Sequence, residues 1–418
     1  MQLKIKRGDF YLLFYKIIIF IGIFDGIRTK LVFGGPFTIL KEISTIILLI
    51  GILYERLKIN KKELLITNGP LILYLLFETI VILFNDYDPK FLSINREMAK
   101  GFALHFKTIE SFFLIFILLK FEELTQKKYS YLLRYFIKYS VWYVIVNYLF
   151  YFFLPISIIA KPWYGRISVG YPTADAQILV IALLANLFIK NLFRPTTTKA
   201  ISTLLIIGII TNVTLSAYLS LVFVLLLYII QTINTKGIFS FKSIIILSLI
   251  AIFSITCIYF YNNAEGNFGQ LLRLKIDYGI GKITGNSDKM NSDPSEEIRN
   301  YQEKMAFSIK KDALSKTLGG PISVSGLIED EKNFLYRAYG IVSLFFYYGW
   351  IIYLFFNGLF FYIKKQMLFA YLLFGLLGIY IICNQSLANT YMFGISASFA
   401  LILSSIFKNQ LILKKTST

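Results

Sequence analysis

The feature that most constrains this chain is a succession of apolar stretches long enough to cross a lipid bilayer, interrupted once by a long polar stretch. About 20 consecutive apolar residues span the ~30 Å hydrocarbon core of a membrane. Runs of this length recur between residues 11 and 261 and again after residue 336. Because a backbone inside lipid has to satisfy its own hydrogen bonds, such runs favour helices. The sequence therefore predicts an all-α polytopic membrane protein.

About twelve transmembrane helices are expected, at residues 10–27, 37–55, 64–85, 101–120, 131–156, 169–190, 200–214, 216–233, 242–261, 337–361, 367–383 and 387–407. The seventh and eighth meet with almost no loop, so one re-entrant unit is an alternative there. The chain then divides into helices one to nine (1–261), a large polar loop (262–336), and helices ten to twelve with a tail (337–418). No cleavable signal peptide is expected, because the first apolar run lacks a small-residue cleavage site and continues as a span.

The distribution of charge favours one orientation of these helices. The formal net charge of +19 would by itself suggest nucleic acid as a partner. With the N-terminus in the cytoplasm, however, 22 Lys and Arg residues fall in cytoplasmic segments and seven in the short outer loops, which follows the positive-inside rule. The basic excess is thus a topology signal, and no nucleic-acid binding is expected. Both termini are expected in the cytoplasm and the large polar loop outside it.

The loop after the fifth expected helix combines cations with aromatic side chains. Its sequence, IAKPWYGRISVGYPTADAQ, contains Lys161, Tyr164 and Arg166 beside glycine and proline. One interpretation is an aromatic rim at the membrane interface. The other is a site for a sugar carried on a lipid diphosphate, because Arg donates paired hydrogen bonds to phosphate oxygens. Asp175 falls just inside the sixth helix, and ionisable residues within a membrane are costly and usually functional.

The large polar loop holds a second set of candidate residues. Residues 296–317 show apolar side chains at roughly helical spacing, Tyr301 among them, with charged residues between. This amphipathic helix is expected to lie on the membrane surface or to cover an active site as a lid with Arg299 directed inward, and the two roles are compatible. The sequence GGP at 319–321 is expected to end it.

Glu331 and Arg337 stand at the entrance to the tenth expected helix. At the membrane surface, a carboxylate can act as a general base while a neighbouring Arg binds a phosphate group. The alternative is a solvated acid in the first turn of a helix, where the helix dipole favours negative charge.

Neither a metal nor a cofactor is expected from the remaining motifs. Two cysteines in apolar spans and a single histidine, His105, do not make a metal cluster. The acid pair in Asp86-Tyr87-Asp88 could hold a metal ion, but three residues are a weak pattern and a solvated loop is the favoured interpretation. The GIGKITG stretch at 279–285 lacks the spacing and the preceding strand of a dinucleotide-binding fingerprint.

Three segments, taken with this layout, carry a family resemblance. The first comprises Arg166, Gly170, Tyr171 and Pro172, the second Thr214, Leu215 and Ser216, and the third Gly319, Gly320, Glu331, Asn333, Phe334, Leu335 and Gly340. With a large outer loop before the last few of many helices, the chain resembles the bacterial O-antigen polymerase and O-antigen ligase superfamily. The resemblance covers essentially the whole chain in architecture.

The resemblance implies inverting, metal-independent glycosyl transfer on the outer face of the bacterial cytoplasmic (inner) membrane. The donor would be a glycan on undecaprenyl diphosphate, and the acceptor would be the non-reducing end of a lipid-linked repeat unit. The implied base is Glu331 or, as an alternative, Asp175, and the implied diphosphate- and substrate-binding residues are Arg166, Arg299, Arg337, Lys161, Tyr164 and Tyr301. Membrane lipid and the flippase and chain-length regulator of the same pathway are the implied partners.

Two departures from the family pattern bear on function. The family commonly has Arg after Thr-Leu-Ser, whereas this chain has Ala217, so one phosphate contact is missing or comes from Arg299 or Arg273. Ligases typically carry a His in the large outer loop, and the single His of this chain is His105, in the fourth expected helix. We therefore expect a repeat-unit polymerase for O-antigen or capsule. An O-antigen ligase and a lipid-linked oligosaccharide flippase are the alternatives.

Overall fold

In the part of the chain that the structure describes, the regular elements are helices, apart from one isolated β-bridge between Leu31 and Ile159. The computed structural model describes residues 7–31, 126–155, 158–159, 166–236, 266–286, 313–318, 330–384 and 392–416, with single residues and short runs between 39 and 81 and between 248 and 304. The helices are α1 (Arg7–Lys30), α5 (Gln126–Phe153), α6 (Pro172–Phe188), α7 (Pro195–Thr211), α8 (Leu215–Lys236), α10 (Gly266–Thr284), α13 (Ala313–Leu318), α15 (Glu331–Ile363), α16 (Met367–Asn384) and α17 (Phe393–Thr416). The expected all-α class is confirmed.

Local sequence sets where three of these helices begin. Pro172 and Pro195 stand at the first positions of α6 and α7, where a missing backbone N–H costs nothing and the fixed φ suits a helix. Asp330 caps α15, because its carboxylate accepts a hydrogen bond of 2.8 Å from the backbone N–H of Asn333.

Several helices are long and apolar enough to cross a membrane. Among the described residues they are Tyr129–Phe153, Leu215–Asn234, Glu331–Ile363 and Met367–Asn384, and shorter apolar helices cover Pro172–Phe188, Pro195–Thr211 and Phe393–Ile406. These helices support a membrane protein. The expected spans 37–55, 64–85, 101–120 and 242–261 lie wholly or mostly outside the described residues, so the number of twelve stays a prediction.

The region of the seventh and eighth expected spans forms two helices. α7 has 17 residues and α8 has 22, and they are joined through Val213, whose φ is +47°. α7 packs mainly on α6 and α5, whereas α8 packs mainly on α16 and α6. The structure therefore has two helices in this region, and their assignment as two membrane spans stays a prediction.

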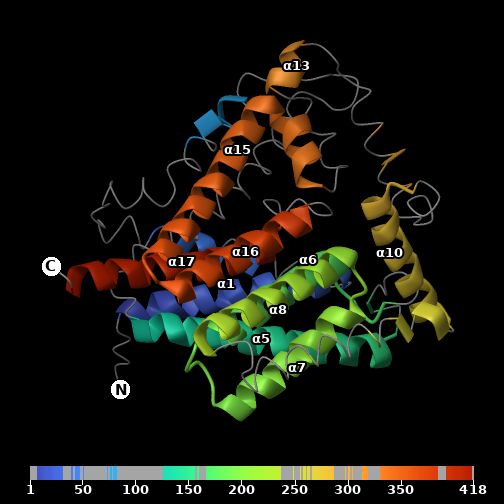
Figure 1. Cartoon of the computed structure of the whole chain (residues 1–418), viewed down its shortest axis with the longest axis horizontal. Helices are drawn as coiled ribbons and strands as arrows, with labels where there is room; N and C mark the ends of the chain where they lie inside the picture. The colour runs from blue at the N-terminus through green and yellow to red at the C-terminus, as the bar shows by residue number, and fades with distance from the viewer. Residues whose placement is uncertain are drawn as a thin grey trace.

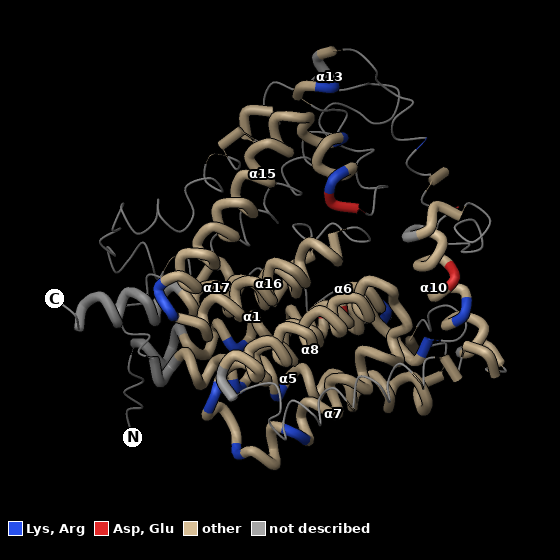
Figure 2. The backbone as a smooth tube through the Cα atoms, in the orientation of Figure 1, with Lys and Arg blue, Asp and Glu red and all other residues tan. Residues whose placement is uncertain are grey.

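One end of the helical bundle carries basic side chains. Arg134, near the start of α5, donates to the carbonyl of Asn191 just after α6, and Asn234, at the end of α8, donates to the hydroxyl of Tyr371 at the start of α16. These contacts place the α6–α7 and α15–α16 connections at the same end of the bundle (Figure 1). We call it the basic end. Its residues are Arg134, Lys190, Arg194, Lys199, Lys364 and Lys365, and Figure 2 shows blue segments there.

α15 is bent back on itself at Gly340, whose φ of 79° and ψ of −173° are not helical. The Ser343 hydroxyl donates to the carbonyl of Gly340 at 2.8 Å and lies 3.2 Å from the carbonyl of Leu335, so it joins the two limbs. Figure 1 shows the short limb, residues 331–339, folded back beside the long limb, residues 341–363. The tenth helix was expected to begin at residue 337; it begins at Glu331, and its first turns form this separate limb.

The polar loop contains a helix, α10, that was not expected from the sequence. A Cβ atom at Gly279 of α10 would lie 3.1 Å from the side chain of Leu215, so α10 packs on the start of α8. Most of the GIGKITG stretch belongs to this helix, which agrees with rejecting it as a nucleotide-binding loop. The expected amphipathic helix 296–317 lies largely outside the described residues. Its end overlaps α13, which packs on α15 and ends just before GGP.

Candidate functional site

Buried polar side chains gather at the end of the bundle opposite the basic end. The hydroxyl of Tyr148, late in α5, hydrogen-bonds to that of Thr211, the last residue of α7, at 2.7 Å. At the same end, Ser220 near the start of α8 lies beside Cys383 at the end of α16, and Tyr380 of α16 lies close to Glu331 on the short limb of α15. We call this the polar end. Polar groups in apolar helices are costly unless they serve packing or function, so the polar end is the candidate site.

Asp175 lies in the first turn of α6 and is 3% exposed. The hydroxyl of Tyr143 on α5 donates to its Oδ2 atom at 2.5 Å. Two glycines make room for the carboxylate, because a Cβ atom at Gly26 of α1 would lie 2.5 Å from Oδ1 and one at Gly170 would overlap Oδ2. We call these four residues the Asp175 cluster. It joins α1, α5 and α6 around one buried carboxylate.

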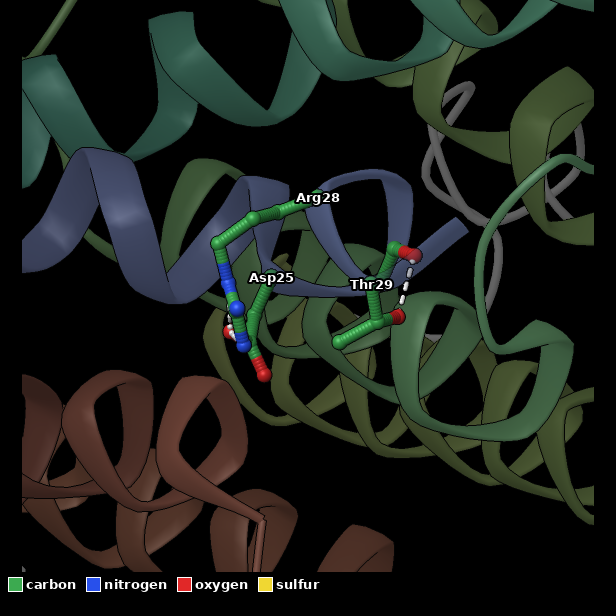
Figure 3. A network of polar contacts seen from close by, with 4 residues as sticks. Asp25, Arg28 and Thr29 are labelled. Carbon is green, nitrogen blue, oxygen red and sulfur yellow. Dashed lines mark hydrogen bonds and ion pairs between the residues drawn. The ribbon is translucent and has the colours of Figure 1, made fainter. Parts of the chain in front are cut away.

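The α1 side of this cluster carries charges of both signs. Arg28 and Asp25 form an ion pair with Nη2 and Oδ1 2.6 Å apart, and the Thr29 hydroxyl donates to the carbonyl of Gly26 at 2.8 Å (Figure 3). Asp25 and Lys30 are also close enough to the buried carboxylate of the cluster to interact with it electrostatically. The end of α1 therefore brings both a cation and a second acid to the Asp175 cluster.

The segment before α6 carries Arg166 and is held by its neighbours. Asn147 of α5 uses both ends of its amide, since Nδ2 donates to the carbonyl of Ile167 at 3.0 Å and Oδ1 accepts from the N–H of Val169 at 2.7 Å. The N–H of Ile167 in turn donates to the carbonyl of Thr211 at 3.1 Å. Helices α5 and α7 thus fix the backbone next to Arg166, whose side chain is half-buried.

The start of α8 presents hydroxyl groups towards α16. Ser220 lies 3.5 Å from the sulfur of Cys383, and Ser216 hydrogen-bonds to the same thiol. Thr214, the residue before α8, is buried, and no described residue hydrogen-bonds to its hydroxyl. Within the described ranges the same is true of both ends of the Gln177 amide on α6. Buried polar groups of this kind are uncommon, so these residues also belong to the candidate site.

Glu331 is 0% exposed at the start of the short limb of α15. Tyr347 of the long limb and Tyr380 of α16 lie close enough to interact with it electrostatically, and their hydroxyls are hydrogen-bonded to each other. Asn384, the last residue of α16, donates to the Tyr347 hydroxyl at 2.9 Å. We call these four residues the Glu331 cluster. Glu331 lies in the first turn of a helix, as one interpretation of the sequence expected. Its carboxylate is buried, however, and not solvated.

Arg337 lies on the same short limb and is 4% exposed, with its Nη2 atom buried. A guanidinium keeps its charge at any physiological pH, so the helical hairpin of α15 holds a permanent cation and a carboxylate in its buried part. Arg273, considered above as a substitute for the missing Arg at Ala217, is exposed on α10 and donates to the carbonyl of Tyr261 at 2.9 Å.

The predicted site residues thus fall into three groups. Asp175, Glu331 and Arg337 are buried at the polar end, and Arg166 is half-buried there. Tyr301 is 65% exposed. Lys161, Tyr164, Arg299, His105 and the acids Asp86 and Asp88 lie outside the described residues. Asp175 and Glu331 belong to separate clusters at the same end of the bundle, one on α1, α5 and α6 and the other on α15 and α16.

Several polar residues of the site were not predicted from the sequence. They are Tyr143, Asn147, Gln177, Tyr347, Tyr380 and Asn384. The sequence could have indicated two of them. Asn147 and Gln177 are amides inside otherwise apolar helices, where polar residues usually face the bundle interior. The tyrosines carried no such signal, since the chain has 29 of them.

Replacing Tyr143 by Phe tests the Asp175 cluster. The change removes one of the donors to the buried carboxylate, which keeps a hydrogen bond from the backbone of Tyr171, and is expected to lower the free energy of unfolding by about 1–3 kcal/mol. Thermal unfolding of the purified protein in detergent measures the loss. Adding Asp175→Asn to Tyr143→Phe should recover part of it, because the amide is neutral. Tyr362→Phe, at an exposed position of α15, is the matched control, and an equal loss in both single variants would contradict the role of the hydroxyl.

Comparison with known proteins assigns no family, so the functional inference is drawn from the candidate site. No protein-family model matches this sequence. No curated protein matches it either.

Proposed function

We propose that this protein is a membrane glycosyltransferase that polymerises lipid-linked repeat units of an O-antigen or a capsular polysaccharide. The observation that carries the proposal is the fully buried Glu331 beside the Tyr347 and Tyr380 hydroxyls, with Arg337 on the same limb. A carboxylate held away from bulk water, on the same helical limb as a buried cation, suits a general base that works near an anionic leaving group. The resemblance to the O-antigen polymerase and ligase superfamily supplies the substrate class.

The proposed reaction needs one base and several cations. The acceptor hydroxyl oxygen attacks the anomeric carbon of the donor glycan, and the bond from that carbon to the diphosphate oxygen breaks. Glu331 takes the hydroxyl proton, with Asp175 as the alternative base. The diphosphate leaves with its electron pair, and Arg166 and Arg337 stabilise its charge, assisted by Arg299 and Lys161. Attack from the face opposite the diphosphate inverts the anomeric configuration. A metal or a cofactor is not part of the proposal.

The proposed orientation puts the polar end outside the bacterial cytoplasmic membrane and the basic end in the cytoplasm. Lys and Arg concentrate on the cytoplasmic side of membrane proteins. The basic end described above would then face the cytoplasm, together with both termini. Tyr164 and Tyr301 would contact sugars at the outer face, and the undecaprenyl tails of both substrates would lie against the lipid-facing sides of the helices. A flippase would deliver the repeat units and a chain-length regulator would set the polymer length.

The proposal is tested by the surface glycan of a strain that lacks this protein, compared on a gel with the complemented strain. A polymerase predicts loss of the long ladder with a single repeat unit retained. Loss of every repeat, with polymer accumulating on the lipid carrier, would mean a ligase instead. Single repeats that accumulate at the cytoplasmic face would mean a flippase. Unchanged ladders in both strains would contradict all three.

Replacing Arg166 or Arg337 by Ala is expected to shorten the ladder to single repeats in the complemented strain. Removing one group that stabilises transition-state charge typically lowers kcat by about 10²–10³-fold. Lys at either position should recover only part of the activity, because it lacks the two-pronged geometry of Arg. Arg134→Ala, at the exposed basic end, is the matched control and should keep the full ladder. Full ladders from both Arg166→Ala and Arg337→Ala would contradict their assignment to the diphosphate.

A further inference from the structure

We propose that Asn147 is a positioning residue whose side-chain amide fixes the segment carrying Arg166, so that the guanidinium meets the diphosphate of the donor. The inference rests on the proposed function, because it concerns what holds one of the diphosphate-binding residues in place. The juxtaposition that carries it is a buried amide of α5 paired on both sides with the backbone of residues 167–169.

The Asn147 amide pairs with the backbone of residues 167–169 in the way that the backbone of a neighbouring β-strand would. An Asn amide carries a donor and an acceptor at opposite ends, like a peptide group. Here the donor meets the carbonyl of Ile167 at 3.0 Å and the acceptor meets the N–H of Val169 at 2.7 Å. With the bond from the Ile167 N–H to Thr211 at 3.1 Å, three hydrogen bonds from two helices hold the backbone that directly follows Arg166.

The side-chain amide of Asn147 is buried, and its hydrogen bonds go to the backbone of residues 167–169. The residue is 3% exposed within the apolar sequence VIVNYLF of α5. A buried amide is costly unless its hydrogen-bonding groups are satisfied. Both ends of this amide are hydrogen-bonded to residues of the segment, one to Ile167 and one to Val169. An amide in this position therefore stabilises the segment's conformation more than it stabilises the packing of α5.

The other end of the segment is fixed from the same face of α5. Tyr143 is four residues before Asn147, so the two side chains lie one above the other on the helix. The Tyr143 hydroxyl binds Asp175, and Gly170 packs so closely on that carboxylate that a Cβ atom there would overlap it. α5 thus holds the segment at residues 167–169 through Asn147 and at residue 170 through the Asp175 cluster, and Arg166 directly precedes these residues.

The consequence for the reaction is geometric. A displacement of about 1 Å in a group that stabilises a transition state can cost about 100-fold in rate. Without the Asn147 amide the backbone of residues 167–169 loses two of the three hydrogen bonds described above, and the position of Arg166 is less well defined. The charge on Arg166 remains, so the variant would still bind an anionic donor, and the loss should appear chiefly in kcat.

The test uses the full-length protein in proteoliposomes, with undecaprenyl-diphosphate-linked repeat units as donor and acceptor. Asn147→Ala is expected to lower kcat by about 10- to 100-fold while KM changes less. Asn147→Asp gives a sharper readout, since a protonated carboxyl supplies a donor and an acceptor as the amide does. Its activity relative to that of the unaltered protein should therefore rise as the pH is lowered. Asn357→Ala removes an amide that donates within its own helix, to the carbonyl of Tyr353, and is the matched control.

A second measurement needs no activity. Hydrogen–deuterium exchange of a peptide covering residues 166–170 should be faster in Asn147→Ala than in the unaltered protein or in Asn357→Ala. Unchanged exchange together with unchanged kcat in Asn147→Ala would overturn the positioning role while the proposed function stands. A fall in activity of Asn147→Asp that is the same at every pH would also overturn it. Absence of polymer from the unaltered protein would instead overturn the proposed function.

Discussion

Replacing Glu331 by Gln is expected to stop polymerisation while the protein still folds in the membrane. The two side chains have nearly the same shape, so the packing of the short limb of α15 against Tyr347 and Tyr380 should survive. The amide cannot accept the proton of the acceptor hydroxyl, and loss of a general base typically lowers the rate by about 10²–10⁴-fold. The surface glycan should then consist of single repeat units, with the protein present in the membrane at its normal level.

Asp330→Asn is the matched control for this variant. The neighbouring acid caps α15 by accepting from the N–H of Asn333 at 2.8 Å. Asn is as good a helix cap as Asp, so the helix start should be kept and the charge alone removed. A full ladder from Asp330→Asn and single repeats from Glu331→Gln are expected. A full ladder from Glu331→Gln would exclude Glu331 as the base, and Asp175 would then be examined by Asp175→Asn.

Replacing Gly340 by Ala is expected to destabilise the protein severely. The φ of 79° and ψ of −173° at this residue lie in a region that only glycine adopts readily, and holding another residue there costs about 1–3 kcal/mol. A Cβ atom would also overlap the backbone carbonyl of Thr317 on α13, so either that helix or the α15 hairpin has to move. The Glu331 cluster spans both limbs of the hairpin. We therefore expect both a lower unfolding temperature in detergent and a loss of activity.

Gly349→Ala is the matched control, because it adds the same methyl group to the same helix at a residue with helical backbone angles. Gly349 lies in the helical part of the long limb, and a Cβ atom there would meet no described atom within 4 Å apart from its chain neighbours and the backbone of its own helix. Because Ala favours a helix over Gly by roughly 1 kcal/mol, this variant should be as stable as the unaltered protein or slightly more so. Equal stability of Gly340→Ala and Gly349→Ala would contradict the strained turn at Gly340.

The helices of the bundle could be predicted from the sequence because length and apolar composition fix them. The expected spans at 10–27, 131–156 and 367–383 correspond to α1, α5 and α16 within a few residues. The hairpin of α15 could not be predicted in this way. It depends on the conformation of Gly340 and on the close approach of α13, and both are set by tertiary contacts rather than by the local pattern.

The candidate site was predictable where one residue type was informative by itself. Asp175 stands out as an acid inside an apolar helix, and the structure finds it buried. Its donor, Tyr143, is 32 residues away in the chain and is one of many tyrosines, so the pairing was not visible. The burial of Glu331 was missed for a similar reason, since the residues around it come from the long limb and from α16 and meet it only after the chain bends at Gly340.

The most direct measurement is polymerisation by the purified protein. Proteoliposomes that contain only this protein and undecaprenyl-diphosphate-linked repeat units of the native glycan should form a ladder of lipid-linked products and release undecaprenyl diphosphate in equal number to the bonds formed. The same vesicles with Glu331→Gln should retain single units. Conversion of no repeat unit by the unaltered protein, with folded protein and accessible substrate, would contradict the assignment as a polymerase.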